Sequence, residues 1–385
     1  MATEVTASAT LYFGPWYRKS PYFEATRRYG CTAFDIYNHT YLPAHYDDPV
    51  NEYWHLLNHV TIWDVGVERQ VEISGPDAFA FTSMLTPRNL SDCAVGQCRY
   101  VVITDQDGGI VNDPVLLRLA PDRFWLSAAD SDLLLWAKGV AVNSALDVNI
   151  GEPDVWPLQV QGPRSKEVIQ KLFGDDVVSL RYYHCAEAEV DGIPVVVSRT
   201  GWTGEVGYEI YLRDSSRGDE LWEKVMAAGK PYDIRPIAPC EARRIEAGIF
   251  NYRSDMTLEN NPFEVTGLER LVHLDKEGGF IGREALARIS AEGVRRKLVG
   301  VRIEGEQLPV ELAEPWPVLR ADNVVGRVTD AIWSPRLKTN IGFAWVPIEL
   351  SGAGTELRVE SPGTTLTARV APLPFLDPKK KIPWS

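Results

Sequence analysis

The residues that are most suggestive of chemistry lie in a glycine-rich segment, RTGWTGEVGYEIYL (199–212). Its glycines recur at every third position, Gly201, Gly204 and Gly207, with Trp202 between the first two. This spacing fits neither the G-x-G-x-x-G loop of dinucleotide sites nor the G-x-x-x-x-G-K-[ST] loop of phosphate sites. The flanking segments IPVVVSRT and YEIYL are strand-like in composition, so the pattern predicts a hairpin closed by a tight glycine loop.

Within this hairpin, Trp202 and Glu209 are candidates for binding a flat heteroaromatic ring. A tryptophan in a glycine-rich loop offers an apolar face at a place where backbone groups can approach a ligand closely. Because side chains alternate along a strand, Glu209 shares one sheet face with Gly207 and Tyr211. A carboxylate beside an aromatic wall suits a ring with N–H donors, such as a pterin. The residues alone are equally consistent with a structural Glu209 that pairs with an arginine.

A second candidate segment is GQCRYVVITDQDGGIVNDPVLLRL, which reads as two strands joined by the turn DQDGG. Asn112 and Asp113 follow this turn, where polar side chains can point toward a cleft. The next segment, FWLSAADSDLLLW, reads as a strand that enters a helix. Ser127 and Asp130 are natural capping residues there, and we interpret Asp130 and Asp132 as caps rather than as site residues.

Composition limits the class of protein. A chain of 385 residues is long enough for two or three domains, and 45% apolar with 24% charged residues is typical of a globular protein. The net charge of −13 argues against a nucleic-acid partner. The sequence has no H-E-x-x-H, no Cys/His cluster at metal spacing and no G-x-S-x-G. His55 and His59 are four apart and can share a helix face, but without a third ligand we favour a surface or packing role.

Cysteine usage and hydropathy suggest a cellular location. The five cysteines form no C-x-x-C pair and are odd in number, so we expect buried thiols of a reducing compartment; they are Cys31, Cys93, Cys98, Cys185 and Cys240. The first residues lack a basic start followed by an apolar core, and the longest apolar run, LLLWAKGVAV, is too short to span a membrane. We therefore expect a soluble, cytoplasmic protein without a membrane partner.

The order of segments along the chain predicts the architecture. VEISGPDAFAFTSML (71–85) and LQVQGPRSKEVIQKLF (158–173) both read as a strand, a Gly-Pro turn and an amphipathic helix. This weak repeat suggests two related α+β domains, although the unit is common in unrelated proteins. After about residue 290, short strands separated by turns predict an all-β C-terminal domain, a small barrel or jelly roll. We expect the last residues, DPKKKIPWS, to form a solvated tail.

The N-terminal region is rich in aromatic residues, which favour either a core-capping arm or a pocket lining. They are Trp16, Tyr17, Phe23, Tyr37, Tyr41, Tyr46, Tyr53 and Trp54.

Taken together, these segments resemble the folate-dependent aminomethyltransferase family, which includes the T-protein of the glycine cleavage system. The blocks that carry the resemblance, in order, are WDVGVERQVEISGPDA, GGIVNDP, LQVQGP, RTGWTGEVGYEI, RRIEAGI, NPFEVTGLERLVHLDKEGGFIGREAL and SPRLKTNIGFAWV. The family implies an α+β fold in a three-domain cloverleaf, with tetrahydrofolate in a central hole. The implied domains are 1–52 with 154–276 as the folate-binding domain, 53–153 as a second α+β domain and 277–385 as the all-β domain.

The resemblance also implies roles for single residues. Trp202 takes the place of the family's pterin-side tyrosine, and Glu209 that of the carboxylate that binds the pterin. Two departures stand out: Asn112 replaces the first of two consecutive acids, and Cys240 replaces an arginine. The complete set of expected site residues comprises Asn112, Asp113 and Tyr100 as catalytic, Trp202, Glu209, Tyr100, Ser127 and Arg199 as cofactor-binding, and Trp16, Tyr17 and Tyr37 as substrate-binding.

With these departures, the sequence is most similar to the dimethylsulfoniopropionate demethylase branch of the family. That branch implies redox-neutral transfer of a methyl group from a small sulfonium or methylated amine to N5 of tetrahydrofolate, without metal, flavin or nicotinamide. O-demethylation of methoxylated aromatics, aminomethyl transfer and a non-catalytic folate-binding scaffold remain as alternatives. We expect tetrahydrofolate and a small methyl donor as the binding partners, and a monomer or homodimer.

Overall fold

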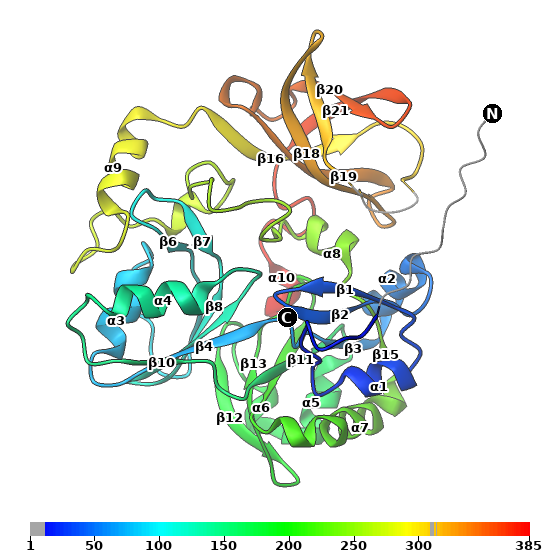
Figure 1. The fold of residues 1–385 in the computed structure, drawn as a ribbon. Helices are drawn as coiled ribbons and strands as arrows, with labels where there is room; N and C mark the ends of the chain where they lie inside the picture. The colour runs from blue at the N-terminus through cyan, green and yellow to red at the C-terminus, as the bar shows by residue number, and fades with distance from the viewer. Residues whose placement is uncertain (1–11, 309–311, 313) are drawn as a thin grey trace.

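A six-stranded sheet forms the centre of the first of three bodies in the computed structural model, which describes residues 12–308, 312 and 314–385 (Figure 1). Its strands in spatial order are β12 (Cys185–Val190), β13 (Ile193–Ser198), β14 (Gly207–Leu212), β11 (Trp156–Gln161), β3 (Val60–Asp64) and β15 (Ile234–Pro236). Only the β3/β15 pair is parallel. The predicted hairpin is therefore confirmed as β13 and β14, which pair in antiparallel register.

Helices cover one face of this sheet. They are α1 (Phe23–Arg28), α5 (Ser165–Phe173), α6 (Asp175–Val178) and α7 (Gly218–Gly229), while α2 (Pro49–Asn58) and α8 (Glu241–Glu246) lie nearer the barrel (Figure 1). Along β14, Tyr208, Ile210 and Leu212 enter the core beneath α5 and α7. The alternation of a strand sends Tyr211 to the other face, where it packs with residues of the second sheet. Glu209, two residues before Tyr211, is thereby directed away from the apolar core.

The second body has a five-stranded sheet with the strand order β10 (Asn149–Gly151), β4 (Arg69–Ser74), β9 (Arg123–Ala128), β8 (Val115–Ala120) and β5 (Cys98–Tyr100). Its helices are α3 (Ala78–Leu85) and α4 (Leu133–Ala141), and β6 (Ile103–Thr104) pairs with β7 (Ile110–Asn112). An apolar layer joins this sheet to the first one through Cys98, Leu117 and Trp125 on one side and Cys185, Val196 and Tyr211 on the other. The two sheets therefore hold each other in a defined position.

The third body is a closed barrel, as the short C-terminal strands predict. Its strands are β16 (Arg296–Ile303), β17 (Trp316–Arg320), β18 (Asn323–Ser334), β19 (Thr339–Pro347), β20 (Glu356–Ser361) and β21 (Thr364–Ala371). The helix α9 (Arg283–Glu292) precedes it, and the hairpin β1 (Ala33–Tyr37) and β2 (Thr40–His45) lies beside the first body (Figure 1). Two α+β bodies and a barrel agree with the predicted fold class.

The weak sequence repeat corresponds to a repeated piece of structure. Strand β4 leads through Gly75 and Pro76 into α3, and β11 leads through Gly162 and Pro163 into α5. Both glycines have positive φ, 121° and 117°, in the region that side chains rarely adopt. A Cβ at either position would also lie within 2.8 Å of a backbone oxygen. The Gly-Pro turn thus needs glycine for the same two reasons in both bodies.

A buried ionic cluster joins the first body to the barrel. Arg244 Nη1 lies 2.8 Å from Asp255 Oδ2, and the same guanidinium pairs with Glu241 and with Asp330 of β18. The adjacent Arg243 pairs with Glu205 at 2.7 Å. Because removing one partner from such a cluster leaves a buried charge uncompensated, at a cost of about 3–5 kcal/mol, this cluster fixes how the barrel sits on α8.

The structure bears on the sequence-based expectations for the C-terminal residues and for the domain that contains β3. The last residues are mostly exposed, as a solvated tail predicts, but they also form the short helix α10 (Lys381–Trp384), in which Pro383 is buried, and Arg199 donates to the carbonyl oxygens of Pro383 and Ser385 (Figure 1). Strand β3 pairs within the six-stranded sheet, although the predicted boundary at residue 53 assigned it to the second domain. The domain boundaries themselves stay a prediction.

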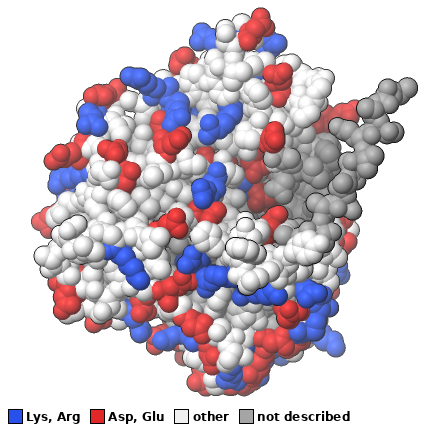
Figure 2. All heavy atoms as spheres, in the orientation of Figure 1, with Lys and Arg blue, Asp and Glu red and all other residues white. Residues whose placement is uncertain are grey.

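The burial of the cysteines and the mixed charge of the surface agree with the sequence-based expectations. All five cysteines are free and buried. On the face drawn in Figure 2, basic side chains are interspersed with acidic ones. Among the described helices, none has the length and apolar character that crossing a bilayer requires.

Candidate active site

Glu209 is the buried centre of a polar row that runs across the six-stranded sheet. Its neighbours in register are Ser198 on β13 and Gln159 on β11. Gln159 Nε2 donates to Glu209 Oε1 at 2.7 Å, Tyr211 Oη donates to Oε2 at 3.1 Å, and Thr200 also donates to Oε2. Its partners in the described part of the chain are thus hydroxyls and an amide, not the arginine that a structural role suggested. Burial raises the pKa of Glu209, and these hydrogen bonds oppose the rise.

Two further carboxylates, Glu68 and Asp113, come from the second body to the same place. Glu68 precedes β4, and Asp113 follows β7. Burial, together with the charges of Glu209 and Asp113, raises the pKa of Glu68 well above its ordinary value. Burial also raises the pKa of Asp113 to about 7, although Tyr100 Oη donates to its Oδ2 at 2.8 Å. We call Glu68, Asp113 and Glu209 the acidic group.

The acidic group brings together residues of the two sheets, and its members differ in exposure. Glu68, Asp113 and Tyr100 lie deep in the molecule, yet each keeps part of its surface accessible. Tyr37 is half-buried and lies close enough to Glu68 and Asp113 for their charges to raise its pKa further, beyond the main effect of burial. Carboxylates and phenols therefore lie close together here, an environment that attracts a cation or a group with N–H donors.

Unpartnered acceptors point to the same kind of ligand. Ser127, on β9, donates to Glu68 Oε2 at 3.0 Å and accepts from Gln70 Nε2 at 2.8 Å. The oxygens Gln70 Oε1 and Gln159 Oε1 are buried and have no partner among the described residues. Because buried acceptors are nearly always hydrogen-bonded, two such atoms beside two carboxylates favour a ligand that donates several hydrogen bonds.

The side chain of Asn112 is turned away from the acidic group. Its Nδ2 donates to Ala129 O at 3.1 Å and to Ser131 Oγ at 2.7 Å, and its Oδ1 accepts from Ala129 N at 3.2 Å. All its polar atoms thus hold the loop between β9 and α4. The expected caps are not made there: Ser127 lies within β9, and Asp132, at the N-cap position, forms no capping hydrogen bond.

The side chain of Gln161, at the end of β11, explains why the loop needs glycines. Its Nε2 donates to Thr200 O and Tyr208 O, and Thr203 Oγ1 donates to its Oε1. A Cβ at Gly201 or Gly207 would lie 2.2–2.6 Å from the amide atoms of Gln161. The glycines therefore make room for an internal side chain that binds both sides of the hairpin, and they position Thr200 against Glu209.

The other expected site residues contact residues outside the acidic group or are exposed. Trp202 packs with the apolar group around Trp63 and Tyr53, and the guanidinium of Arg244 lies 5.5 Å from its ring. Arg199 binds the C-terminal residues. The side chain of Trp16 is 88% exposed, and Tyr17 contacts Tyr41, 5.8 Å between ring centroids. A ligand-binding role for these residues stays a prediction.

A hollow of about 250 Å³ adjoins the site. It is lined by the β1–β2 turn, by Gln70 on β4 and by the start of α4, including Ser131. Gln70 and Ser131 are the partners of Ser127 and Asn112, so the hollow and the acidic group share their supporting side chains.

Comparisons with known proteins agree with this architecture. Residues 21–276 match the GCVT N-terminal domain, and residues 296–377 match the glycine cleavage T-protein C-terminal barrel domain. The crystal structure of the glycine cleavage system aminomethyltransferase T from Bartonella henselae superposes with a TM-score of 0.83 over 94% of this chain and 98% of that chain, at 24% identity. The chain therefore belongs to the glycine cleavage T-protein family.

Two curated relatives cover almost the full length. The dimethylsulfoniopropionate demethylase DmdA of Ruegeria pomeroyi is 38% identical over 345 residues, 90% of this chain and 93% of the relative. An aminomethyltransferase of Symbiobacterium thermophilum is 33% identical over 348 residues, 87% of this chain and 91% of the relative. The resemblance stated from the sequence motifs is thus confirmed.

Sequence reasoning missed Glu68 and the two glutamines. Glu68 lies in the quoted block WDVGVERQV, next to Arg69, a possible ion-pair partner. In the structure Arg69 pairs instead with Glu152, which leaves Glu68 to face the interior. The signal that could have found it is the apolar character of the residues before it, since Val65 and Val67 are both buried.

Proposed function

We propose that the protein transfers an intact methyl group from dimethylsulfoniopropionate, or a closely related small sulfonium, to N5 of tetrahydrofolate. The relative of 38% identity that demethylates dimethylsulfoniopropionate supports this substrate. The observation that carries the proposal is the acidic group, which has no ion-pair partner among the described residues and so favours the positively charged sulfonium group of such a donor. A neutral aryl ether would gain nothing from such surroundings.

The polar row on the first sheet suits the folate ring. Glu209 with Gln159 Oε1 would accept hydrogen bonds from the N–H groups of the pterin, and Gln70 Oε1 offers a further acceptor. Thr200 and Tyr211 keep the Glu209 carboxylate in one orientation. Because their hydrogen bonds are made before a ligand arrives, the carboxylate needs little reordering on binding.

The donor would occupy the side of Asp113, Glu68 and Tyr37. A sulfonium there is attracted by the carboxylates, and a phenol face contributes about 0.5–2 kcal/mol to the binding of an onium group. Exclusion of water by the two sheets strengthens these attractions. Positioning of donor and acceptor can lower the barrier of such a transfer by roughly 7–11 kcal/mol.

The chemistry needs no acid to expel the leaving group. The carbon–sulfur bond breaks with both electrons left on sulfur, which departs as a neutral thioether, while N5 of tetrahydrofolate supplies the electron pair of the new bond and loses one proton. Asp113, with a pKa of about 7, is suited to hold that proton. The replacement of an acid by Asn112 is compatible with this reaction, because its amide holds the 129–131 loop instead.

The expected cytoplasmic location and a monomer or homodimer stay part of this proposal. The five buried free thiols support a reducing compartment.

The first test identifies the donor and the form in which carbon moves. The enzyme is incubated with tetrahydrofolate and trideuteromethyl-labelled sulfonium, amine or aryl-ether compounds, and folates are measured by mass spectrometry. We expect 5-methyltetrahydrofolate with three deuteria from the sulfonium. Methylene-tetrahydrofolate with two deuteria indicates aminomethyl-type transfer, turnover of the ether indicates O-demethylation, and binding without any turnover indicates a scaffold; each contradicts the proposal.

Glu209→Gln should weaken tetrahydrofolate binding about tenfold, because a hydrogen bond to a charged acceptor contributes roughly 1–3 kcal/mol. The affinity is measured by calorimetry, with Glu72→Gln on the second sheet as a control that keeps wild-type affinity. Equal affinity for Glu209→Gln and wild type would remove Glu209 from the folate site.

Donor binding should depend on the ionisation of Asp113. With a pKa of about 7, Asp113 is mostly neutral at pH 6 and mostly ionised at pH 8, so its ionised fraction rises roughly tenfold. The KM for the sulfonium should therefore fall severalfold between these pH values. Asp113→Asn should give a high KM with a flat profile, whereas the exposed Asp107→Asn should keep the wild-type profile. A wild-type profile in Asp113→Asn is the contradicting result.

A further inference from the structure

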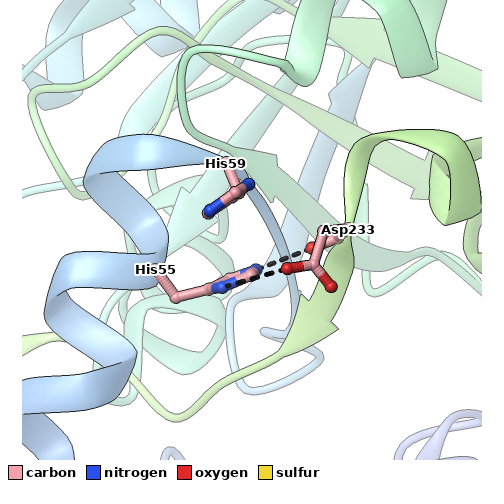
Figure 3. Close-up of side chains that lie close together, drawn as sticks. All are labelled: His55, His59 and Asp233. Carbon is pink, nitrogen blue, oxygen red and sulfur yellow. Dashed lines mark hydrogen bonds and ion pairs between the residues drawn. The ribbon is translucent and has the colours of Figure 1, made fainter.

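The C-terminal end of α2 brings two histidines together with an aspartate from a distant part of the chain (Figure 3). His55 lies in the last turn of α2, and His59 follows the helix as its C-cap. Their rings are stacked, with centroids 4.7 Å apart. Asp233 directly precedes β15 and faces both rings. One ligand atom from each of the three residues lies within 4.8 Å of the other two.

The backbone of Asp233 determines which nitrogen of His55 is free. Nε2 of His55 lies 2.7 Å from Asp233 O, and a carbonyl oxygen can only accept, so Nε2 carries the hydrogen. Nδ1 then faces Asp233 Oδ2 at 4.0 Å, which is too long for a hydrogen bond. A histidine that donates one N–H to a backbone carbonyl and directs its other nitrogen at a carboxylate has the arrangement found around metal ions.

We propose that His55 Nδ1, His59 and Asp233 form a binding site for a divalent transition-metal ion, with Zn²⁺ as the ion bound in the cell. Zinc bonds to nitrogen and oxygen are about 2.0–2.2 Å long, so two ligand atoms of one tetrahedral ion lie about 3.4 Å apart. The Nδ1 to Oδ2 distance is 4.0 Å and all three ligand atoms lie within 4.8 Å of one another, so the side chains have to approach by about 1 Å to hold an ion. Two imidazoles and one carboxylate are a ligand set that zinc accepts.

Arg235 competes with the metal for Asp233. Its Nη2 lies 2.9 Å from Asp233 Oδ2. The side chains of Arg235 and Asp233 are 57% and 50% exposed, so the guanidinium can move into solvent when an ion binds. Surface pairs of this kind contribute little to stability, so the competition lowers metal affinity without preventing binding. Exposure of Asp233 also leaves room for water to complete the coordination.

The ion would connect α2 to the entrance of β15, which are about 180 residues apart in the chain. Leu56, beside His55, is fully buried in the group that contains Trp63 and Ile237. A bound ion would therefore stabilise the packing of α2 on the first sheet, since a ligand that binds only the folded state stabilises it. The site uses none of the residues of the acidic group, so this inference does not rest on the proposed function.

The test is zinc binding to tag-free protein that has been treated with a chelator. Calorimetry should give one ion per chain with micromolar or tighter affinity, and added zinc should raise the apparent melting temperature. Cobalt should give the visible absorption of a low-symmetry, nitrogen-containing site. Buried free cysteines do not compete in the folded protein.

Variants separate this site from other histidines. His59→Ala and Asp233→Asn should each weaken zinc binding at least about tenfold, as even lost supporting contacts do at metal sites. Arg235→Gln should strengthen it severalfold, and the exposed His45→Ala should leave it unchanged. His55 is buried and holds the Asp233 backbone, so it is not used as a test. The proposal is overturned if no stoichiometric binding occurs, or if His59→Ala and Asp233→Asn bind zinc like wild type.

Discussion

The candidate site depends on three carboxylates that are enclosed between two sheets. Among the described residues, no basic side chain forms an ion pair with them. Glu209, Glu68 and Asp113 are held by hydroxyl and amide donors, and burial raises the pKa of each. An enclosed charge without a counter-charge is costly, and such groups respond by remaining protonated. The cost is relieved when a cation arrives, which is why this place suits a charged methyl donor.

Some other buried charges of the protein are compensated by direct ion pairs. At the junction with the barrel, Arg243 and Arg244 meet Glu205, Asp255 and Asp330 in direct ion pairs. That cluster is already compensated and serves to hold two bodies together. The acidic group is less completely buried and has no such arginines among the described residues, so its charge is available to a ligand. Carboxylates with raised pKa values and no ion-pair partner among the described residues are candidates for a functional site.

Much of the architecture could be predicted from local patterns. The β13–β14 hairpin, the two strand–Gly-Pro–helix units and the C-terminal barrel are each encoded within short segments, by alternation and by glycine positions. The tail was predicted only in part: its lysines are exposed, as their charge suggests, but local sequence does not predict its contact with Arg199, almost 190 residues away. The partner of Glu209 was also unpredictable in detail, because Gln159 reaches it only through strand register.

The site residues also include some that local patterns predict and others that only tertiary contacts bring into the site. Glu209 and Asp113 could be proposed from strand and turn patterns, but Glu68 and Gln70 become part of the site only when the second sheet meets the first. In the same way, His55 and His59 suggested no more than a shared helix face until β15 brought Asp233 beside them. Contacts between segments far apart in sequence are what a single sequence leaves undetermined.

The central claim, that enclosed carboxylates ionise to receive a cationic donor, is tested most directly by counting protons. Dimethylsulfoniopropionate is titrated into folate-free enzyme by calorimetry in buffers of different ionisation enthalpy, at pH values on both sides of 7. Because Asp113 has a pKa of about 7, the account predicts that binding releases close to one proton more at pH 6 than at pH 8. Binding without proton release at either pH would contradict it.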